Sequence, residues 1–498
     1  MIRCGRQEGW LAQPSSELEN WAVLNGGSFN GVKCAVAGGD RGSGLLAIRD
    51  LKGGDEGPLL VVPRDLVISK EAVEVAAKSD KDLRELLEAL GEFVQTTRGA
   101  VLTFLLYTAT VTAARRSNYQ LGSLTPFNQY IKFLPDELLP TFWTPDEVAL
   151  LDGTSLQAAL EAKQRSLERE FALLAEATQD VRWCQDLWWG SSPDASLNLS
   201  LDDWKAVDAM YRSRVLEFPG IGDAMVPCID MANHAAGEAA SALYETDGAG
   251  NAILLLRDGM DVRHGEEVTI TYGDRKGACE MLFSYGFIDE SMEDARELFL
   301  PLEMDDDDPL ARPKDHVATV APGVKFYKDD ETGALKWRSE YVYLMNVNQE
   351  DGLEFAFAQT VTGERELQML FHDTPVGSTA DLLSALQKDP QWDVHHLRAV
   401  VKLSQLVEQR LNIISSLENG ALTERRAKPT VRERCFELAL RLRFLEGQLL
   451  MQAFVALEQE RDELLNDSPV VREYLVKQAS GDGSQQQHAE LELDEDFT

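Results

Sequence analysis

The chain has 498 residues, of which 44% are hydrophobic and 8% aromatic, enough apolar material for more than one globular core. Its 84 Asp and Glu residues against 48 Lys and Arg residues give a net charge of −36. A surface this acidic repels phosphate backbones and anionic lipid head groups, which argues against nucleic acid or a membrane as partner and favours a basic protein or peptide.

Residues 1–20 form an N-terminal segment without the apolar core of a signal peptide, and they carry acidic residues that transit peptides avoid. No apolar run of about 18 residues occurs in the chain, so no membrane span is expected. The six cysteines form no CxxC pair, which argues against a structural zinc site and a disulfide framework. We expect a soluble intracellular protein, cytoplasmic or nuclear, without a bound metal.

Short apolar runs broken by glycine and proline occupy 32–69 and return at 223–272, and they predict short strands joined by turns. Between them apolar residues recur at helical spacing, and Thr144 with Glu147 has the capping-box pattern of a helix start. Because neighbouring strands of a sheet need not be neighbours in sequence, we expect one β-rich domain over 21–290 with a helical insertion at about 75–205.

The C-terminal part begins with an acidic region, 291–340, that contains "MDDDDP" and is expected to be a linker. Apolar residues then keep helical spacing, for example from Val400 to Ile414, which predicts an all-α domain over 341–478. The last residues, 479–498, have the composition of a disordered acidic tail. The predicted fold class is therefore α+β, a β-rich domain with a helical insertion followed by an all-α domain.

Several common catalytic patterns are missing from the sequence, including Walker A, G-x-S-x-G and H-E-x-x-H. Asp230 and His234 have the spacing of two ligands on one helix turn. Pro227 before them and Gly237 after them argue against a regular helix, and no third ligand is evident. No metal site is predicted.

Three segments place polar and aromatic residues beside glycine. The first, "VPCIDMANHAAG" at 226–237, is expected to contain an apolar strand, Val226–Ile229, followed by a binding loop. The second is the glycine turn "GDRGSGLLA" at 39–47, and the third holds two Tyr-Gly pairs that begin at Tyr272 and Tyr285. Each feature alone is typical of a tight turn or a packed core aromatic, but together they predict a binding site.

The motifs "VPCIDMANHA", "GEEVTITYGD" and "YGF", with "GSGLLA" near the start and "YRSRV" at 211–215, resemble the SET-domain protein methyltransferases of the Rubisco large-subunit lysine methyltransferase type. "WAVLNGGSF", "FWTPDEVALLDGT" and the helical C-terminus extend the resemblance over roughly 21–475. It implies S-adenosylmethionine as methyl donor and a SET domain with a helical substrate-binding domain behind it. A methyl group transferred in line from a sulfonium to a side-chain nitrogen needs a positioned, neutral acceptor.

The resemblance also implies roles for individual residues. Tyr272 corresponds to the catalytic tyrosine. The implied cofactor contacts are Arg41, Ser43, Asn233, His234, Tyr285 and Phe287, and the implied substrate contacts are Ser213, Arg214 and Asp230. Arg41 and Ser43 at the glycine turn, and Ala278 between the two Tyr-Gly pairs, depart from residues that are frequent in the family at these positions.

The acceptor implied by the resemblance is a lysine of a protein substrate, engaged by the C-terminal helical domain. Two alternatives stay open. A histidine acceptor satisfies the same collinear geometry, because related proteins of this architecture include one that acts on histidine. A non-catalytic SET-like module would bind a protein partner without methylating it. The sequence does not indicate the oligomeric state.

Overall fold

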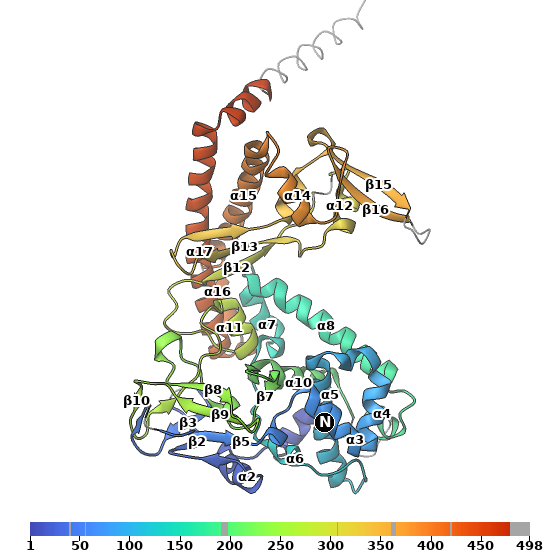
Figure 1. The fold of residues 1–498 in the computed structure, drawn as a ribbon, viewed down its shortest axis with the longest axis vertical. Helices are drawn as coiled ribbons and strands as arrows, with labels where there is room; N and C mark the ends of the chain where they lie inside the picture. The colour runs from blue at the N-terminus through green and yellow to red at the C-terminus, as the bar shows by residue number, and fades with distance from the viewer. Residues whose placement is uncertain are drawn as a thin grey trace, which may run out of the picture. The chain divides into compact units, whose positions relative to one another are not determined.

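The computed structural model describes residues 1–38, 41–54, 56–190, 198–305, 307–359, 365–418 and 421–478 (Figure 1). The chain divides into two compact units. Unit 1 comprises Met1–Trp143, Ala159–Lys276 and Glu280–Glu290. Unit 2 comprises Thr144–Ala158, Gly277–Cys279 and the chain from Ser291 onward. Within the described residues, no helix combines the length and apolarity that crossing a membrane requires. The predicted tail, 479–498, lies outside the described residues.

Unit 1 contains several small antiparallel sheets. One has the order β11-β3-β2 and another the order β1-β5-β9-β8, while β4 pairs with β10 and β6 with β7. Their bounds are β1 Ser28–Phe29, β2 Val32–Val36, β3 Ser43–Ala47, β4 Leu51–Lys52, β5 Leu60–Val62, β6 Val215–Phe218, β7 Gly222–Met225, β8 Ala242–Thr246, β9 Ala252–Leu256, β10 Asp261–Val262 and β11 Glu267–Val268. Strands before the helical block thus pair with strands after it, as the sequence predicts.

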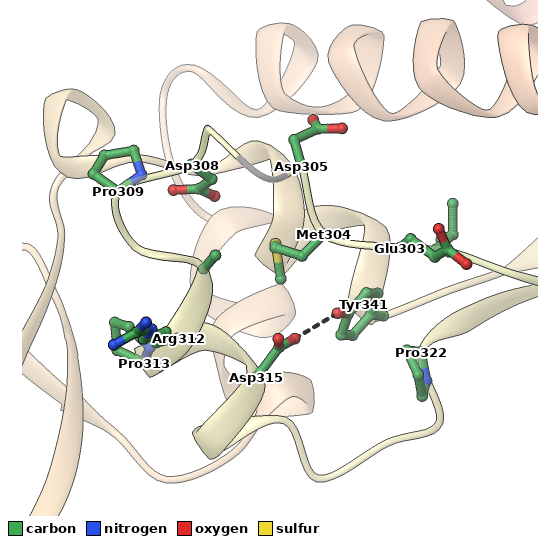
Figure 2. A pocket seen from close by; sticks show the side chains of 12 residues that line it. Glu303, Met304, Asp305, Asp308, Pro309, Arg312, Pro313, Asp315, Pro322 and Tyr341 are labelled. Carbon is green, nitrogen blue, oxygen red and sulfur yellow. Dashed lines mark hydrogen bonds between the residues drawn. The ribbon is translucent and has the colours of Figure 1, made fainter.

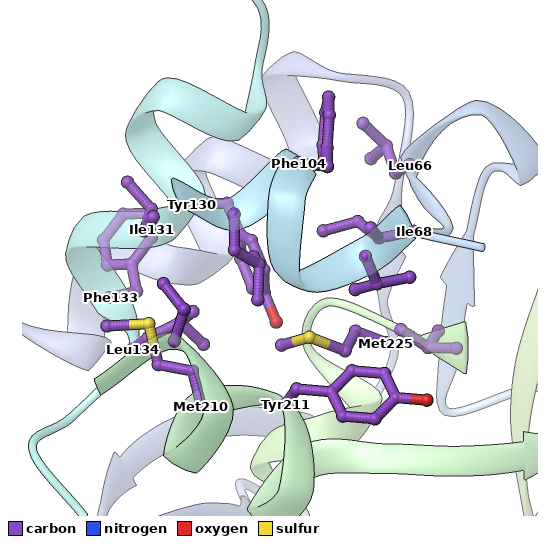
Figure 3. Close-up of a cluster of buried hydrophobic side chains, with 14 of the residues drawn as sticks. Leu66, Ile68, Phe104, Tyr130, Ile131, Phe133, Leu134, Met210, Tyr211 and Met225 are labelled. Atoms are coloured by element: carbon purple, nitrogen blue, oxygen red, sulfur yellow. The ribbon is translucent and has the colours of Figure 1, made fainter. Parts of the chain in front are cut away.

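The helical insertion of unit 1 lies beside these sheets (Figure 1). Its main helices are α3 Lys70–Ser79, α4 Lys81–Leu90, α5 Thr97–Arg116, α6 Phe127–Phe133, α8 Ser155–Ala177, of which unit 1 holds the part from Ala159, and α10 Leu201–Arg214. Helix α5 is buried on every side from Gly99 to Val111, so it is the central helix of the core. Side chains of α5, α6, α10 and β7 meet there (Figure 3).

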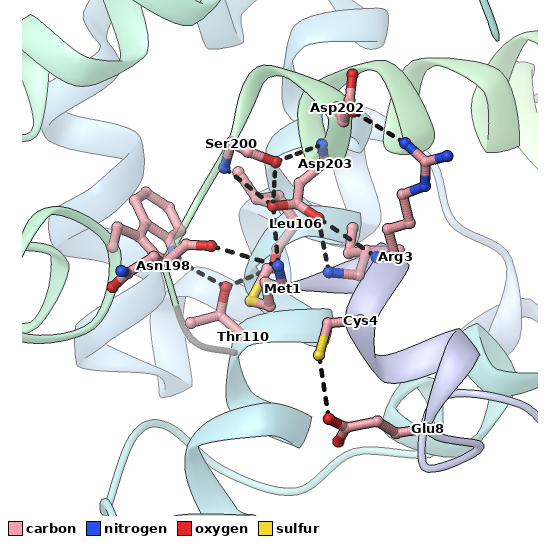
Figure 4. A network of polar contacts seen from close by, with 12 residues as sticks. Met1, Arg3, Cys4, Glu8, Leu106, Thr110, Asn198, Ser200, Asp202 and Asp203 are labelled. Atoms are coloured by element: carbon pink, nitrogen blue, oxygen red, sulfur yellow. Dashed lines mark hydrogen bonds and ion pairs between the residues drawn. The ribbon is translucent and has the colours of Figure 1, made fainter. Parts of the chain in front are cut away.

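The first residues of the chain belong to unit 1 and are not a separate segment. Helix α1, Ile2–Gln7, packs on α10, where Asp203 accepts hydrogen bonds from the Met1 amino group (3.0 Å to Oδ2) and from the Ile2 amide (2.7 Å to Oδ1) (Figure 4). Both charged groups of this ion pair are fully buried. Ile2 and Leu11 are also fully buried, and their apolar burial explains why the predicted segment 1–20 joins the core.

The region 291–340, predicted as a linker, instead folds into a sheet of unit 2. Strands β12 Glu297–Pro301, β13 Gly323–Lys328 and β14 Leu335–Arg338 are antiparallel in the order β12-β13-β14. The inward-facing residues of this sheet are apolar and buried: Leu298, Leu300, Val324 and Phe326. Their alternation with polar residues is a strand signal, and the neighbouring acidic run obscured it at the level of composition.

The acidic run lines a cavity of about 580 Å³ next to α12, Ala311–Val317 (Figure 2). Lys402 bonds Asp305 at 2.8 Å from Nζ to Oδ1, and the buried Lys314 bonds Asp308 at 2.6 Å from Nζ to Oδ2. Tyr341 donates its hydroxyl to Asp315. These acidic residues are therefore partnered within the unit rather than forming a solvated linker.

The rest of unit 2 is mainly helical, with α7 Pro145–Val148, α11 Ala278–Tyr285 shared with unit 1, α13 Tyr341–Asn346, α14 Thr379–Leu386, α15 Trp392–Glu418, α16 Ala421–Arg426 and α17 Glu433–Asp467. The long helices α15 and α17 pack together. A second small sheet joins them: β15 Leu353–Gln359, β16 Arg365–Phe371 and β17 Thr374–Val376. The α+β class is confirmed, and these two sheets are the difference from an all-α C-terminal part.

The predicted capping box at the start of α7 is present. The Thr144 hydroxyl accepts from the Glu147 amide, and the Glu147 carboxylate accepts from the Thr144 amide at 2.8 Å. Glu147 also bonds Arg432. This segment was predicted as part of the insertion, but the contact with the residue before α17 joins it to unit 2.

Candidate functional site

The segment between β7 and Asn233 is not the strand predicted over Val226–Ile229. Strand β7 ends at Met225, Pro227 lacks an amide donor, and Cys228 has a positive φ of 75°. A 3₁₀ helix, Ile229–Met231, follows. The backbone therefore turns sharply at a buried position, and the polar residues after it are placed by this turn rather than by the end of a strand.

Asn233 and His234 are held beside the strand-like segment that leads to Tyr272. The Ile270 amide donates to the Asn233 carbonyl, and the Ala235 amide donates to the Ile270 carbonyl, both at 3.0 Å. His234 is therefore paired in parallel with Ile270. Two segments that lie far apart in sequence meet at this point, which brings the predicted Asn-His pair next to the predicted catalytic tyrosine.

The His234 ring fixes the backbone at Tyr272. Its Nδ1 accepts the Tyr272 amide at 3.0 Å, so this nitrogen carries no proton. The proton of the neutral ring therefore resides on Nε2, which lies 3.4 Å from the Asp289 carboxylate. Both ring nitrogens are engaged in this way, and Asp230 points into a different cluster. Within the described part of the chain, no three His, Cys, Asp or Glu side chains are grouped as metal ligands.

Three aromatic rings gather around Tyr272. Its ring centroid lies 4.7 Å from that of Tyr285, 5.3 Å from His234 and 6.2 Å from Phe287. The Tyr272 hydroxyl donates to the Ala232 carbonyl at 2.9 Å. Burial raises the pKa of Tyr272, and the Arg214 charge opposes that rise. The phenol is therefore neutral at physiological pH, and its proton is directed to Ala232.

The glycine turn meets the Asn233 side chain. Asn233 Nδ2 donates to Glu267 Oε1 at 2.6 Å and to the Ser43 carbonyl at 3.3 Å, and Arg41 pairs with Glu267 at 3.3 Å. A Cβ placed on Gly44 would lie 2.2 Å from Glu267 Oε1 and 2.9 Å from Asn233 Nδ2. A residue larger than glycine here would displace these two side-chain ends from the strand. Gly44, the Ser43 carbonyl, Asn233 and Glu267 together form a polar cradle beside the aromatic rings.

The Ser43 side chain itself faces elsewhere. Its hydroxyl donates to the Ser15 hydroxyl at 2.7 Å, whereas its backbone carbonyl is the group that meets Asn233. The Arg41 side chain is more than half exposed. Both residues lie at the cradle, and the contacts that they offer to Asn233 are backbone carbonyls.

The three predicted substrate residues fall into two environments. Ser213 donates its hydroxyl to the Ala209 carbonyl at 2.7 Å within α10. Arg214 donates to the Asp230 carbonyl at 2.9 Å and to Glu137 Oε1 at 2.7 Å. The Asp230 carboxylate is fully buried, accepts the Tyr130 hydroxyl and lies 3.7 Å from the Arg214 guanidinium. Asp230 therefore lies beneath the loop rather than at an open face.

The cluster of Arg214, Asp230 and Glu137 helps to position the loop that contacts Tyr272. Burial raises the pKa of Asp230, while Arg214 and the Tyr130 hydroxyl oppose the rise. Burial would lower the pKa of Arg214, but Glu137 and Asp230 outweigh that effect and raise it. Arg214 stays charged and ties the 3₁₀ helix to α10. The Ala232 carbonyl that accepts the Tyr272 proton follows directly after that helix.

Sequence reasoning missed four residues of this site: Tyr130, Arg212, Glu267 and Lys276. Arg212 donates to the Phe283 carbonyl at 2.8 Å and lies 4.2 Å from the centroid of the Phe283 ring, two residues before Tyr285. The "YRSRV" motif contains Arg212, so a signal existed there. Tyr130 comes from the insertion, and nothing in its local sequence indicates that it meets Asp230.

No protein-family model matches the chain, but it is similar to known proteins. The chain is 29% identical to SET domain-containing protein 8 of Schizosaccharomyces pombe over 425 residues, 82% of this chain and 88% of that protein. It is 27% identical to the Rubisco large subunit N-methyltransferase of Pisum sativum over 355 residues, 68% of this chain and 65% of the relative. An actin-histidine N-methyltransferase of Gallus gallus is 25% identical over 302 residues, 58% and 45% of the two chains.

Solved structures show the same fold. The SET domain of LSMT bound to methyllysine and AdoHcy matches with a TM-score of 0.62 at 21% identity, covering 91% of this chain and 93% of that chain. Rubisco LSMT bound to AdoMet matches with a TM-score of 0.60 at 20% identity, covering 91% and 93%. The SET-domain resemblance predicted from the sequence is confirmed. The chain spans less than two thirds of the length of the pea and chicken relatives.

Proposed function

We propose that this chain, a homologue of SET-domain methyltransferases with the fold of Rubisco LSMT, transfers a methyl group from S-adenosylmethionine to a lysine side chain of a protein. The observation that carries the proposal is the setting of Tyr272. Its hydroxyl is directed by the Ala232 carbonyl, its backbone is held by His234, and its ring adjoins Tyr285 and Phe287. A polar cradle lies beside these rings.

The residues present fit the methyl donor. The Asn233 amide and the Glu267 carboxylate lie close against Gly44 and supply polar groups for the amino-acid end or the ribose of a nucleoside ligand. Tyr285 and Phe287 supply flat apolar surfaces for the adenine ring. When bound, S-adenosylmethionine supplies an electrophilic methyl group on a sulfonium.

Tyr272 contributes by orientation rather than by proton transfer. Because its proton is directed to Ala232, the oxygen presents lone pairs to its other neighbours. Such lone pairs make CH···O contacts with a polarised methyl group, each modest in energy but directional. The raised pKa of Tyr272 keeps the phenol neutral, so it orients the reacting groups without removing a proton itself.

A lysine acceptor suits the aromatic rings, because its aliphatic stem packs on rings while its nitrogen extends beyond them. Lysine must lose a proton before it attacks, since its pKa in water is about 10.4. A histidine acceptor is already neutral at pH 7, with a pKa of about 6.5 in water. The two acceptors therefore predict different pH dependences of methyl transfer.

We further propose that unit 2 binds the protein substrate through one face of α17. Four large apolar side chains on this helix are exposed: Leu440 at 37%, Phe444 at 51%, Met451 at 54% and Val455 at 49%. Their spacing of four and seven residues places them on one side of the helix. Glu437 and Glu458 lie three residues beyond the two ends of this stripe, although Glu458 pairs with Arg461 and Arg441 lies 6.0 Å from the Phe444 ring centroid. The net charge of the chain is −36, so the expected occupant is a basic, amphipathic segment of the substrate.

The test is direct. Isothermal titration with S-adenosylmethionine measures cofactor binding, and the labelled donor incubated with extract proteins measures transfer. Acid hydrolysis of the labelled proteins then separates methyllysine from methylhistidine. Methyllysine supports the proposal, and methylhistidine identifies the alternative acceptor. Absence of donor binding would contradict the enzyme function and favour a non-catalytic binding module.

A further inference from the structure

The charged side chain of Lys276 lies next to the aromatic rings, and the function proposed above assigns it no role. The Lys276 Nζ lies 5.6 Å from the centroid of the Tyr285 ring, and that ring lies 4.7 Å from the Tyr272 ring. The Lys276 side chain crosses Gly273, because a Cβ at Gly273 would lie 3.0 Å from Lys276 Cε. The ammonium group is thus directed toward the site by the chain beneath it.

Lys276 is held in this position by Glu280, which is four residues further along and forms an ion pair with it. The Lys276 side chain is 26% exposed and that of Glu280 is 43% exposed. Burial would lower the pKa of Lys276, but the ion pair with Glu280 and the neighbouring Tyr285 hydroxyl together outweigh it, so the pKa is raised and the group stays charged. Burial raises the pKa of Tyr285, and the Lys276 charge opposes this rise. The charge therefore reaches the aromatic site.

Other charged or titratable groups also face the rings. Glu280 belongs to α11, as does Tyr285, and the Arg214, Glu137 and Asp230 charges act on Tyr272 from below. His234, Asp289 and Asp274 are the remaining titratable groups near these rings. Among the groups that act on Tyr285, Lys276 is the cation.

We propose that Lys276 supplies a fixed positive charge that disfavours a protonated amine beside Tyr272 and Tyr285 and so selects the neutral form of the acceptor lysine. The inference rests on the proposed function, because it concerns the acceptor of the same site. Like charges in a partly buried site repel more strongly than in water. Glu280 attenuates the effect, so Lys276 and Glu280 have opposite influences on the acceptor.

Two ligands measure this charge without any methyl transfer. Sinefungin carries an amine where S-adenosylmethionine carries its methyl sulfonium, whereas S-adenosylhomocysteine is neutral there. We expect Lys276→Met to lower the ratio of the sinefungin Kd to the S-adenosylhomocysteine Kd by roughly three- to tenfold at pH 7, and Glu280→Gln to raise it. Isothermal titration of the full chain gives both constants.

A matched pair elsewhere controls for the loss of a helical ion pair. Lys70 and Glu74 on α3 form the same i,i+4 contact at similar exposure, 32% and 55%. Lys70→Met and Glu74→Gln should leave the ratio unchanged. An unchanged ratio in the Lys276 and Glu280 variants, with both ligands bound, would overturn the inference. If the wild type binds neither ligand, the proposed function itself fails.

The pH profile of transfer separates this role from a structural one. With free lysine as acceptor, the rise of kcat with pH, which reports the ionisation of the bound acceptor, should shift upward by about half a pH unit or more in Lys276→Met. A merely structural loss would lower the whole profile without moving it. Such a drop at constant shape, or a shift in the opposite direction, would contradict the proposal.

Discussion

The buried charged residues of the two units contact different kinds of structure. In unit 1, Arg214, Glu137 and Asp230 gather beneath the loop that carries Ala232, next to Tyr272. In unit 2, the fully buried Glu446 accepts the amide and hydroxyl of Ser155, the first residue of α8, at 2.9 and 2.6 Å. The first cluster holds a site in place, and the second holds the end of a helix.

The candidate site of unit 1 and the exposed stripe of α17 in unit 2 also differ in how their side chains are held. The polar side chains around Tyr272 bond mainly to one another or to nearby backbone, so they are fixed before any ligand binds. The exposed stripe of α17 consists of apolar side chains on a long, well-packed helix. A preorganised site favours effects on turnover, and an exposed stripe favours effects on substrate affinity. Substitutions in each unit test this division.

The largest effect is expected at Arg214. Its replacement by Met leaves Asp230 and Glu137 without their cation at a position where the Asp230 carboxylate is fully buried. Removing one partner of such a buried pair costs about 3 to 5 kcal/mol of the free energy of unfolding. Urea unfolding measures this loss. Arg64→Met is the control, because Arg64 and Glu71 pair at the surface, where the loss stays below about 1 kcal/mol. Equal losses in both variants would contradict a buried cluster.

Glu446 is the corresponding test in unit 2. Burial raises its pKa from 4.5 to about 7, while the bonds from Ser155 oppose the rise. The unfolded chain therefore ionises first as pH rises from about 4.5, and the folded protein loses about 3 kcal/mol of stability by pH 7 through this group. In Glu446→Gln that loss is absent, so the variant gains on the wild type between pH 5 and pH 8.

Unfolding free energies of both proteins at pH 5 and pH 8 check the expected gain. Glu71→Gln is the control, since Glu71 is 72% exposed. A difference between Glu446→Gln and wild type that stays constant with pH would show that Glu446 ionises normally in the folded protein.

Sequence periodicity predicted the long elements well and the site less well. Helices α15 and α17 follow from apolar spacing, and the capping box at Thr144 follows from residue types three apart. Strand β7 ended earlier than predicted because Pro227 and the positive φ of Cys228 stop it. Apolar composition alone cannot distinguish a buried turn from a buried strand.

The candidate site was predicted only where motifs hold several of its residues together. Tyr272, Tyr285 and Phe287 lie in one short stretch, and in the structure the ring centroids of Tyr285 and Phe287 lie 4.7 and 6.2 Å from that of Tyr272. The partner of Asp230 is Tyr130, a hundred positions away in the insertion. Long-range pairings of this kind depend on tertiary packing, which local sequence does not encode. The burial of Asp230 is likewise set by this long-range packing, and its role as a substrate contact stays a prediction.

Tyr272→Phe tests the preorganised site. The variant keeps the ring contacts with Tyr285 and loses the bond to Ala232, which costs about 1 kcal/mol of stability. Turnover should fall about a hundredfold, because the oxygen that orients the reacting methyl group is gone. The Kd for S-adenosylhomocysteine should stay within a factor of about three, since its proposed contacts lie at Asn233 and Gly44. Unchanged turnover would remove Tyr272 from the mechanism.

The smallest effect is expected at the exposed stripe of α17, where the test is which kinetic constant changes, KM or kcat. Met451→Asp places a charge within the stripe, at a side chain that is 54% exposed. The KM for the protein substrate should rise about tenfold, while kcat, the S-adenosylhomocysteine affinity and the unfolding free energy change little. Val75→Asp is the matched control, because Val75 on α3 of unit 1 is also 54% exposed. If both variants raise KM equally, the effect is one of added negative charge rather than of this surface. If Met451→Asp lowers kcat and leaves KM unchanged, the division of binding and turnover between the two units is wrong.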